Sequence, residues 1–476
     1  MSSSYKKPTI QTNHSNIPTI LYGLVAVVLY GFGLFSVFDR LTAPENQEVI
    51  DDVTEGFNDV VGVSLPFLPL ILSLLGLFII VSLVMSYVIV WIMSKIAQEV
   101  TIVVAIVAPF LIMGIGGLMI VASTDLMLVG AIIALVGVGL LVFVIWRFQS
   151  IKRSGQFVEF SAQLVLDEKA VLGMPILLGL FTIVTGFFML FGFLEILALF
   201  EMQDTTTGET GISPVGLIAG LVFEYFYLII YFGVYYSLSG GVVSYASDWY
   251  RGLDPDLGSA MADVRQTLPV IIKFAFAMAT VKIIVQALTG AGRQRTGRQM
   301  SGGAIAGMVL GGIAGIFVRL IGAFWQFLNY FTLVSIIQNK EGLVDSIKDS
   351  AKTTWKSLLD VLVGETGYGL TMFIFAILNS SLWIGAGFLI GVVGFGGDLF
   401  AAIVVAFVFL ILSSLPYNMV TMPMKVAFRT FMYSYAKDYM DGFKKPSRLP
   451  ADLRGEFKNL QQRSDKRKMK DPNMIF

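Results

Sequence analysis

The sequence predicts an all-α polytopic transmembrane helix bundle with about 10 spans plus amphipathic interfacial helices on the cytoplasmic side. Three observations predict this class: 56% of the 476 residues are hydrophobic, only 14% are charged, and the apolar residues form long uncharged runs. A soluble domain contains about 25% charged residues. A run of about 20 apolar residues instead crosses the hydrocarbon core of a bilayer as a helix. The short alternating segments of a β-barrel are absent from the sequence.

Ten apolar runs follow one another along the chain. The first, 17–38, is longer than a signal-peptide core and lacks a small-residue cleavage site, so we expect an uncleaved anchor. The other runs are 65–94, 101–122, 125–147, 171–200, 214–247, 268–290, 303–335, 366–395 and 398–435. The expected units are a four-span module over 1–150, a connector over 151–170, a six-span module over 171–436 and a basic tail over 437–476.

Basic residues predict the orientation of the protein in the cell membrane, because cytoplasmic loops are enriched in Lys and Arg. The N-terminal pair Lys6 and Lys7 and the C-terminal tail fall on the same side, so both termini are expected in the cytoplasm. The acidic segments 41–63 and 201–213 fall on the other side. The loop from Arg293 to Arg298 disagrees with this rule. It is either an exception or the neighbour of a re-entrant run, and the length of both flanking runs favours the exception.

Three stretches on the expected cytoplasmic side mix polar and apolar residues: 150–168, 253–268 and 340–360. In the third, Leu343, Ile347 and Ala351 recur at helical spacing while charged residues occupy the other positions. This pattern is typical of a helix that lies in the membrane interface. A solvated connector helix packed on the spans is the alternative.

Two segments carry a resemblance to a known family. They are Gly258-Ser259-Ala260 through Thr267-Leu268-Pro269, and Glu341-Gly342-Leu343 through Asp349-Ser350-Ala351-Lys352 and Thr354-Trp355. Over about residues 220–430 the chain resembles an uncharacterised family of archaeal and bacterial polytopic membrane proteins of unknown function. The resemblance implies a shared fold and no activity. A likeness to choline transporter-like proteins is confined to the number of spans and the polar tail; no motif matches residue by residue, so it implies no site.

Ionisable residues within a span are costly and therefore informative. Glu224 and Lys282 both lie about 12–15 Å below the outer ends of their helices, at 1.5 Å per residue. We expect them to form an ion pair that fixes helix register, or a solute site as the alternative. Aromatic residues crowd around Glu224, and an acid among ring faces is one way to recognise a quaternary ammonium group. Because these rings point all around the helix, packing is the favoured interpretation.

The run 303–335 carries a face of small residues at four-residue spacing. Small residues at this spacing let another helix approach closely. We expect the partner to be another span of this chain, with a second copy as the alternative. The expected helix-packing face consists of Gly303, Gly307, Gly311, Gly315, Arg319 and Gln326. Further along the chain, Pro416 and Asn418 mark a candidate helix break that could line a solute path.

The sequence offers no support for an enzyme. Cysteine is absent, His14 is the only histidine, and no nucleotide loop or metal-ligand cluster is present. No cofactor is expected, and zero net charge gives no attraction to nucleic acid. The expected partners are membrane lipid and other membrane proteins or a second copy. The favoured function is a non-enzymatic structural or accessory component of a membrane assembly. The alternative is a permease for a small solute, cationic solutes included, which requires an internal cavity lined by polar groups.

Overall fold

The computed structural model describes residues 15–42, 67–123, 126–203, 210–293, 322, 324–394, 396–440 and 447–448. Within these ranges, eight helices are long and apolar enough to cross a membrane. The predicted all-α polytopic bundle is therefore confirmed. The helices are α1 (Ile17–Thr42), α3 (Phe67–Ala122), α4 (Met127–Trp146), α5 (Phe148–Asp167), α6 (Gly173–Leu199), α7 (Pro214–Tyr250), α8 (Leu257–Arg293), α10 (Thr332–Asn339), α11 (Leu343–Lys356), α12 (Leu358–Gly394) and α13 (Leu399–Met440).

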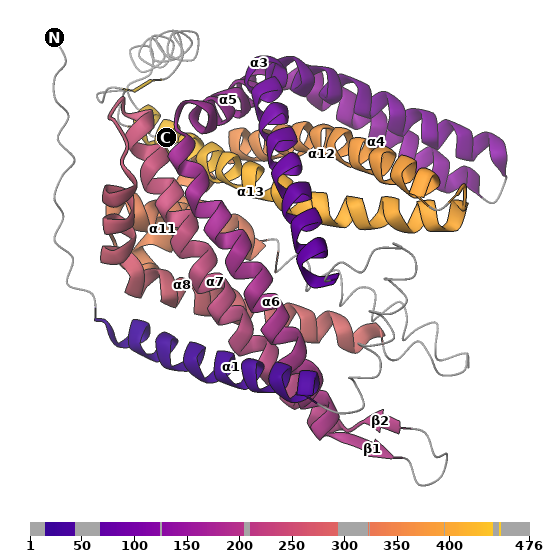
Figure 1. Ribbon diagram of the computed structural model, residues 1–476. Coiled ribbons are helices and arrows are strands. Elements are labelled where there is room, and N and C mark those ends of the chain that lie inside the picture. Colours follow the sequence, from indigo (N-terminus) through magenta and orange to yellow (C-terminus); the bar gives the residue numbers. More distant parts are fainter. Residues whose placement is uncertain are drawn as a thin grey trace, which may run out of the picture.

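Helix α3 merges two of the ten predicted runs, 65–94 and 101–122, into one helix of 56 residues. The polar residues Lys95, Gln98 and Glu99 interrupt the apolar pattern, but no Gly or Pro lies among them to end the helix. Figure 1 shows α3 bending near its middle, so that its two arms run in different directions. At this bend the backbone N–H of Gln98 donates to the Glu159 carboxylate of α5 at 2.9 Å.

Helix α5 covers the predicted interfacial stretch 150–168 but lies largely inside the protein. Eleven of its twenty residues are buried, among them Ser154 and Gly155 on the side toward α3 and α12. A Cβ added at Gly155 would lie 2.6 Å from the Cα of Gln98, so α3 and α5 approach at backbone distance. The amphipathic pattern is the same for a helix in the interface and for one covered by neighbours, and here neighbouring helices cover it.

Helix α11, within the third such stretch, keeps one face exposed. Its buried positions are Ser346, Ser350, Thr353 and Thr354, while Val344 and Trp355 are more than 60% exposed. A Trp and nearby lysines on the uncovered face of a helix suit the membrane–water interface. The geometry of α11 is therefore compatible with the expected interfacial position.

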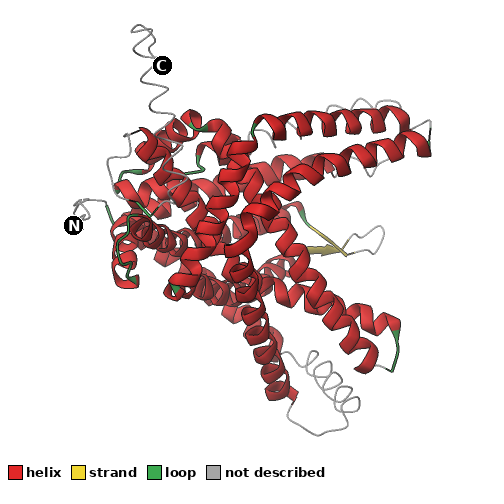
Figure 2. Ribbon diagram, turned by 90° about the horizontal axis from the view of Figure 1, so that it is seen from above, coloured by secondary structure: helices red, strands yellow, loops and turns green. Residues whose placement is uncertain are grey.

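One large core joins helices from both halves of the chain. It includes Met93 of α3, Leu164 of α5, Tyr245 of α7, Ile271 of α8 and Phe431 of α13, all at most 2% exposed. We use the name converging end for the end of the bundle that contains this core and the helices α5, α10 and α11. Figure 2 shows long helical hairpins that lie together on one side of the molecule and diverge on the other.

The hairpin of α12 and α13 is held by small residues. A Cβ at Gly391 would lie 2.5 Å from the Cα of Ala402, and one at Gly387 would lie 2.8 Å from the Cα of Ala406. This is the close packing that small residues at four-residue spacing allow. The face predicted at Gly303, Gly307, Gly311, Gly315 and Arg319 lies outside the described residues, and Gln326 is exposed.

Two smaller features complete the fold. The segment after α6 forms an antiparallel hairpin of β1 (Glu201–Gln203) and β2 (Thr210–Ile212), within the predicted acidic loop 201–213. Helix α1 packs on α6 and α7, where the Tyr22 hydroxyl donates to the carbonyl of Ile230 at 2.8 Å. The N-terminal anchor is thereby tied to the six-span part of the chain.

Candidate functional site

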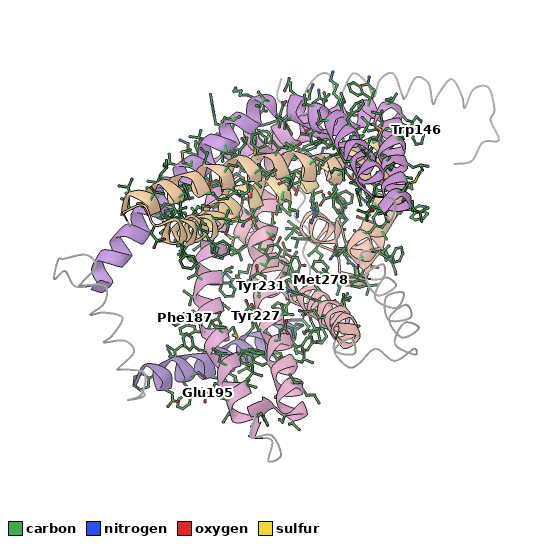
Figure 3. All side chains as sticks on the ribbon, turned by 90° about the vertical axis from the view of Figure 1, so that its right-hand side faces the viewer. Trp146, Phe187, Glu195, Tyr227, Tyr231 and Met278 are labelled. Atoms are coloured by element: carbon green, nitrogen blue, oxygen red, sulfur yellow. The ribbon has the colours of Figure 1, made fainter. Side chains whose placement is uncertain are left out.

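A cavity of about 630 Å³ opens between α6, α7, α12 and α13. This volume is within the range of small-molecule sites, about 300–1,000 Å³. Figure 3 labels Tyr231, one of the lining residues, midway along the hairpin of α6 and α7. The cavity is lined by Pro175, Leu178, Gly179, Thr182, Tyr231, Tyr235, Glu365, Tyr368, Gly369, Met372, Phe373, Ala376, Tyr417, Asn418, Met419, Thr421, Met422 and Lys425.

Helix α12 contributes one continuous face to the cavity. Glu365, Gly369, Met372 and Ala376 follow each other at spacings of three and four residues, so they lie on the same side of the helix. A Cβ added at Gly369 would meet no atom within 4 Å. The missing side chain of Gly369 therefore leaves open space within the cavity.

Helix α13 remains continuous where the sequence predicted a break at Pro416 and Asn418. Both Pro416 and Pro423 lie inside the helix, and each lacks the N–H that would bond to the fourth preceding carbonyl. A proline within a membrane helix can be accommodated by a kink because neighbouring side chains satisfy the freed groups. The prediction of a break was wrong, but Asn418 does line the cavity.

Aromatic rings from three helices form much of the cavity wall. Tyr231 and Tyr235 of α7 stack with ring centroids 6.2 Å apart and planes 16° apart. From the opposite side, the hydroxyl of Tyr417 donates to the carbonyl of Met372 at 3.3 Å, and that of Tyr368 to the carbonyl of Thr421 at 3.5 Å. These bonds hold α12 and α13 together and fix the rings at the cavity.

The charged groups of the site are centred on Glu365. One carboxylate oxygen accepts from the Arg429 guanidinium at 2.7 Å, and the other accepts from the Tyr330 hydroxyl at 2.5 Å. The guanidinium also lies over the ring of Tyr330, 4.6 Å from its centroid. The side chains of Arg429 and Glu365 are 33% and 37% exposed, so the pair is accessible rather than sealed in a core. Lys425 lies one turn before Arg429 on α13 and lines the same cavity.

A second polar cluster lies at the converging end, around Asp349 of α11. Its carboxylate forms an ion pair with Lys437 and accepts hydrogen bonds from Tyr433 at 2.5 Å and Ser335 at 3.0 Å. Burial alone would raise the pKa of Asp349, but the bonds from Lys437 and Tyr433 hold it below its ordinary value. This carboxylate belongs to the segment on which the family resemblance rests, so that motif fixes α11 against α10 and α13.

The structure gives Glu224 and Lys282 separate partners. Glu224 accepts from the side-chain amide of Gln286 at 3.1 Å. The ammonium of Lys282 lies 5.6 Å from the ring centroid of Phe232. The structure therefore does not form the predicted ion pair between them, and neither residue lines the cavity described above. Tyr231 and Tyr235, from the same aromatic run, do line it.

Sequence reasoning missed the charged residues of the site. Glu365 immediately precedes the predicted span 366–395, while Lys425 and Arg429 lie near the C-terminal end of the last predicted span. Long side chains at span ends can reach the headgroups, so such residues carry a weak signal. A stronger signal was available in Lys425 and Arg429 together, since two cations four residues apart on one helix repel each other and need a partner.

Comparison with known proteins yields one family. Residues 131–440 match a family model described as plasma-membrane choline transporter. The expected resemblance to a polytopic membrane family is thus confirmed, and the matched range contains the predicted range 220–430. The matched family has a described function, which corrects the expectation of a family of unknown function. No curated protein matches the sequence.

Proposed function

The chain belongs to the plasma-membrane choline transporter family, and on this premise we propose that it is a transporter for a small solute with a quaternary ammonium group. The cavity between α6, α7, α12 and α13 is the proposed binding site. The family description favours this permease function over the structural or accessory role that the sequence alone favoured.

The observation that carries the proposal is the aromatic wall of the cavity. A quaternary ammonium group has no N–H to donate, so proteins bind it mainly through the negative faces of aromatic rings. Tyr231, Tyr235, Tyr368, Phe373 and Tyr417 all line the cavity, and they come from three different helices. A protein whose helices were packed solid, as a purely structural component could be, would have no need of such a space.

The arrangement of the lining helices supports a transport cycle. One wall comes from the hairpin of α6 and α7 and the other from the hairpin of α12 and α13. A small change in the angle between the two hairpins would widen one end of the cavity and narrow the other. Pro416 and Pro423 leave α13 short of two backbone hydrogen bonds beside the cavity, which makes this part of the helix the easiest to bend.

The test uses two matched glycine variants of α12. A Cβ added at Gly369 meets nothing within 4 Å, so the side chain of Gly369→Leu would begin in open space and occupy part of the cavity. Gly385, on the same helix, has equally open surroundings but does not line the cavity. We expect Gly369→Leu to reduce uptake of radiolabelled quaternary ammonium solutes into proteoliposomes at least tenfold, and Gly385→Leu to retain it. Equal uptake by both variants would contradict the proposed site.

A further inference from the structure

Two charged groups line the cavity, the carboxylate of Glu365 and the ammonium of Lys425. Its carboxylate, Glu365, already has a partner for each oxygen: Arg429 for one and the Tyr330 hydroxyl for the other. The charges of Glu365 and Arg429 therefore cancel, and the carboxylate has little capacity left to attract a cationic solute. Lys425 lines the cavity, whereas Arg429 is not among its lining residues.

Lys425 forms no ion pair within the described ranges of the chain. It lies four residues before Arg429, and like charges at this spacing repel each other. Its side chain is exposed and belongs to the cavity wall. An unpaired ammonium within a membrane helix is costly, and such residues are typical of ion and solute sites.

The aromatic rings and the lysine ammonium lie on different helices that line the same cavity. Tyr231 and Tyr235 come from α7, whereas Lys425 comes from α13. An ammonium group could bind against the rings while an anionic group of the same molecule binds Lys425. A solute with only a positive charge would still bind the faces of the rings, but the ammonium of Lys425 would repel it. The effective dielectric constant inside a protein is lower than that of water, which strengthens the repulsion between two like charges in one cavity.

We infer that the cavity selects zwitterions, in which a quaternary ammonium group is joined to a carboxylate or a phosphate, and that Lys425 binds the anionic group. This inference rests on the proposed transport function and names its substrate class. Lys425 is then the residue that distinguishes a zwitterion from a simple quaternary ammonium cation.

The test compares two solutes and three forms of the full-length protein in proteoliposomes. The solutes are glycine betaine, a trimethylammonium carboxylate, and choline, which has the same cation without an anionic group. The proteins are the wild type, Lys425→Met and Lys425→Arg. We expect the wild type to take up glycine betaine faster than choline. Lys425→Met should lower glycine betaine uptake at least tenfold and raise choline uptake, whereas Lys425→Arg should retain the wild-type preference because it keeps the positive charge.

The outcomes separate this inference from the proposed function. Choline uptake that is abolished by Gly369→Leu but unaffected by Lys425→Met, with no preference for glycine betaine, would leave transport standing and overturn the zwitterion inference. Absence of uptake of either solute by the wild type would overturn both. A change confined to the phosphatidylcholine that co-purifies with Lys425→Met, without any change in uptake, would assign the lysine to a lipid headgroup and also overturn the inference.

Discussion

Glu365 of α12 and Arg429 of α13 form an ion pair of 2.7 Å that joins the two helices beside the cavity. These residues are 64 positions apart in the sequence, so only the packing of the α12–α13 hairpin brings them together. The same pair compensates the charge of Glu365, the one carboxylate that lines the cavity among the residues that the structure describes. Its presence is the reason why Lys425 determines the net charge of the site.

Removing one partner of this pair should destabilise the protein. Glu365→Gln would leave the Arg429 guanidinium without its anion, which costs about 3–5 kcal/mol for a fully buried pair. Because both side chains are about one-third exposed, we expect a smaller loss of about 1–3 kcal/mol. Thermal unfolding in detergent, followed by tryptophan fluorescence, measures the effect. In the double variant Glu365→Gln/Arg429→Gln part of the stability should return; an equal or larger loss would contradict this account.

The Asp349 cluster should contribute more to stability than other charges of α11. Asp349→Asn keeps the size of the side chain but removes the anion that pairs with Lys437 and accepts from Tyr433. We expect a loss of about 2–3 kcal/mol, typical of a charged group with several hydrogen bonds. Asp345→Asn on the same helix is the control, because Asp345 is 68% exposed and pairs with Lys348 only at 3.7 Å. That variant should change the free energy of unfolding by less than about 0.5 kcal/mol.

Neighbouring glycines of α3 provide a test of its contact with α4. A Cβ at Gly116 would lie 2.5 Å from the backbone nitrogen of Ala134 and 2.6 Å from the carbonyl oxygen of Gly130, so Gly116→Ala must push the helices apart. A Cβ at Gly117 would meet no atom within 4 Å. Both substitutions gain the same helix propensity, about 1 kcal/mol. We therefore expect Gly116→Ala to lower the unfolding temperature and Gly117→Ala to maintain or raise it. The reverse order would show that α3 and α4 do not pack in this way.

The sequence was sufficient to predict the class of the fold, because a long apolar run without charges indicates a helix that is surrounded by lipid rather than by water. It could not predict that 65–94 and 101–122 join into one bent helix, since the bend is accompanied by a contact between Gln98 and the distant Glu159. Some residues of the cavity could be recognised from the sequence. Tyr231 and Tyr235 stood out as members of an aromatic run and Asn418 as a neighbour of Pro416, whereas Glu365 looked like an ordinary residue at a span end. Its role depends on which helix lies opposite, and helix pairing is not encoded in local composition.

Glu159 should make stability depend on pH near neutrality. Burial between α5 and the bend of α3, together with the nearby charge of Glu99, raises the pKa of Glu159 from 4.5 to about 7, although the N–H of Gln98 opposes this shift. Between pH 4.5 and 7 the folded protein therefore binds more protons than the unfolded chain. Its free energy of unfolding should fall as the pH rises through this window and stay low above it.

Glu159→Gln isolates this effect because glutamine stays neutral at every pH and can still accept the N–H of Gln98. The difference in unfolding temperature between Glu159→Gln and the wild type should grow in favour of the variant from pH 5 to pH 8 and then level off. Glu99→Gln should move the wild-type transition to lower pH, because it removes a negative charge that disfavours ionisation of Glu159. Parallel pH profiles for wild type and Glu159→Gln would mean that Glu159 ionises as readily in the folded protein as in the unfolded chain.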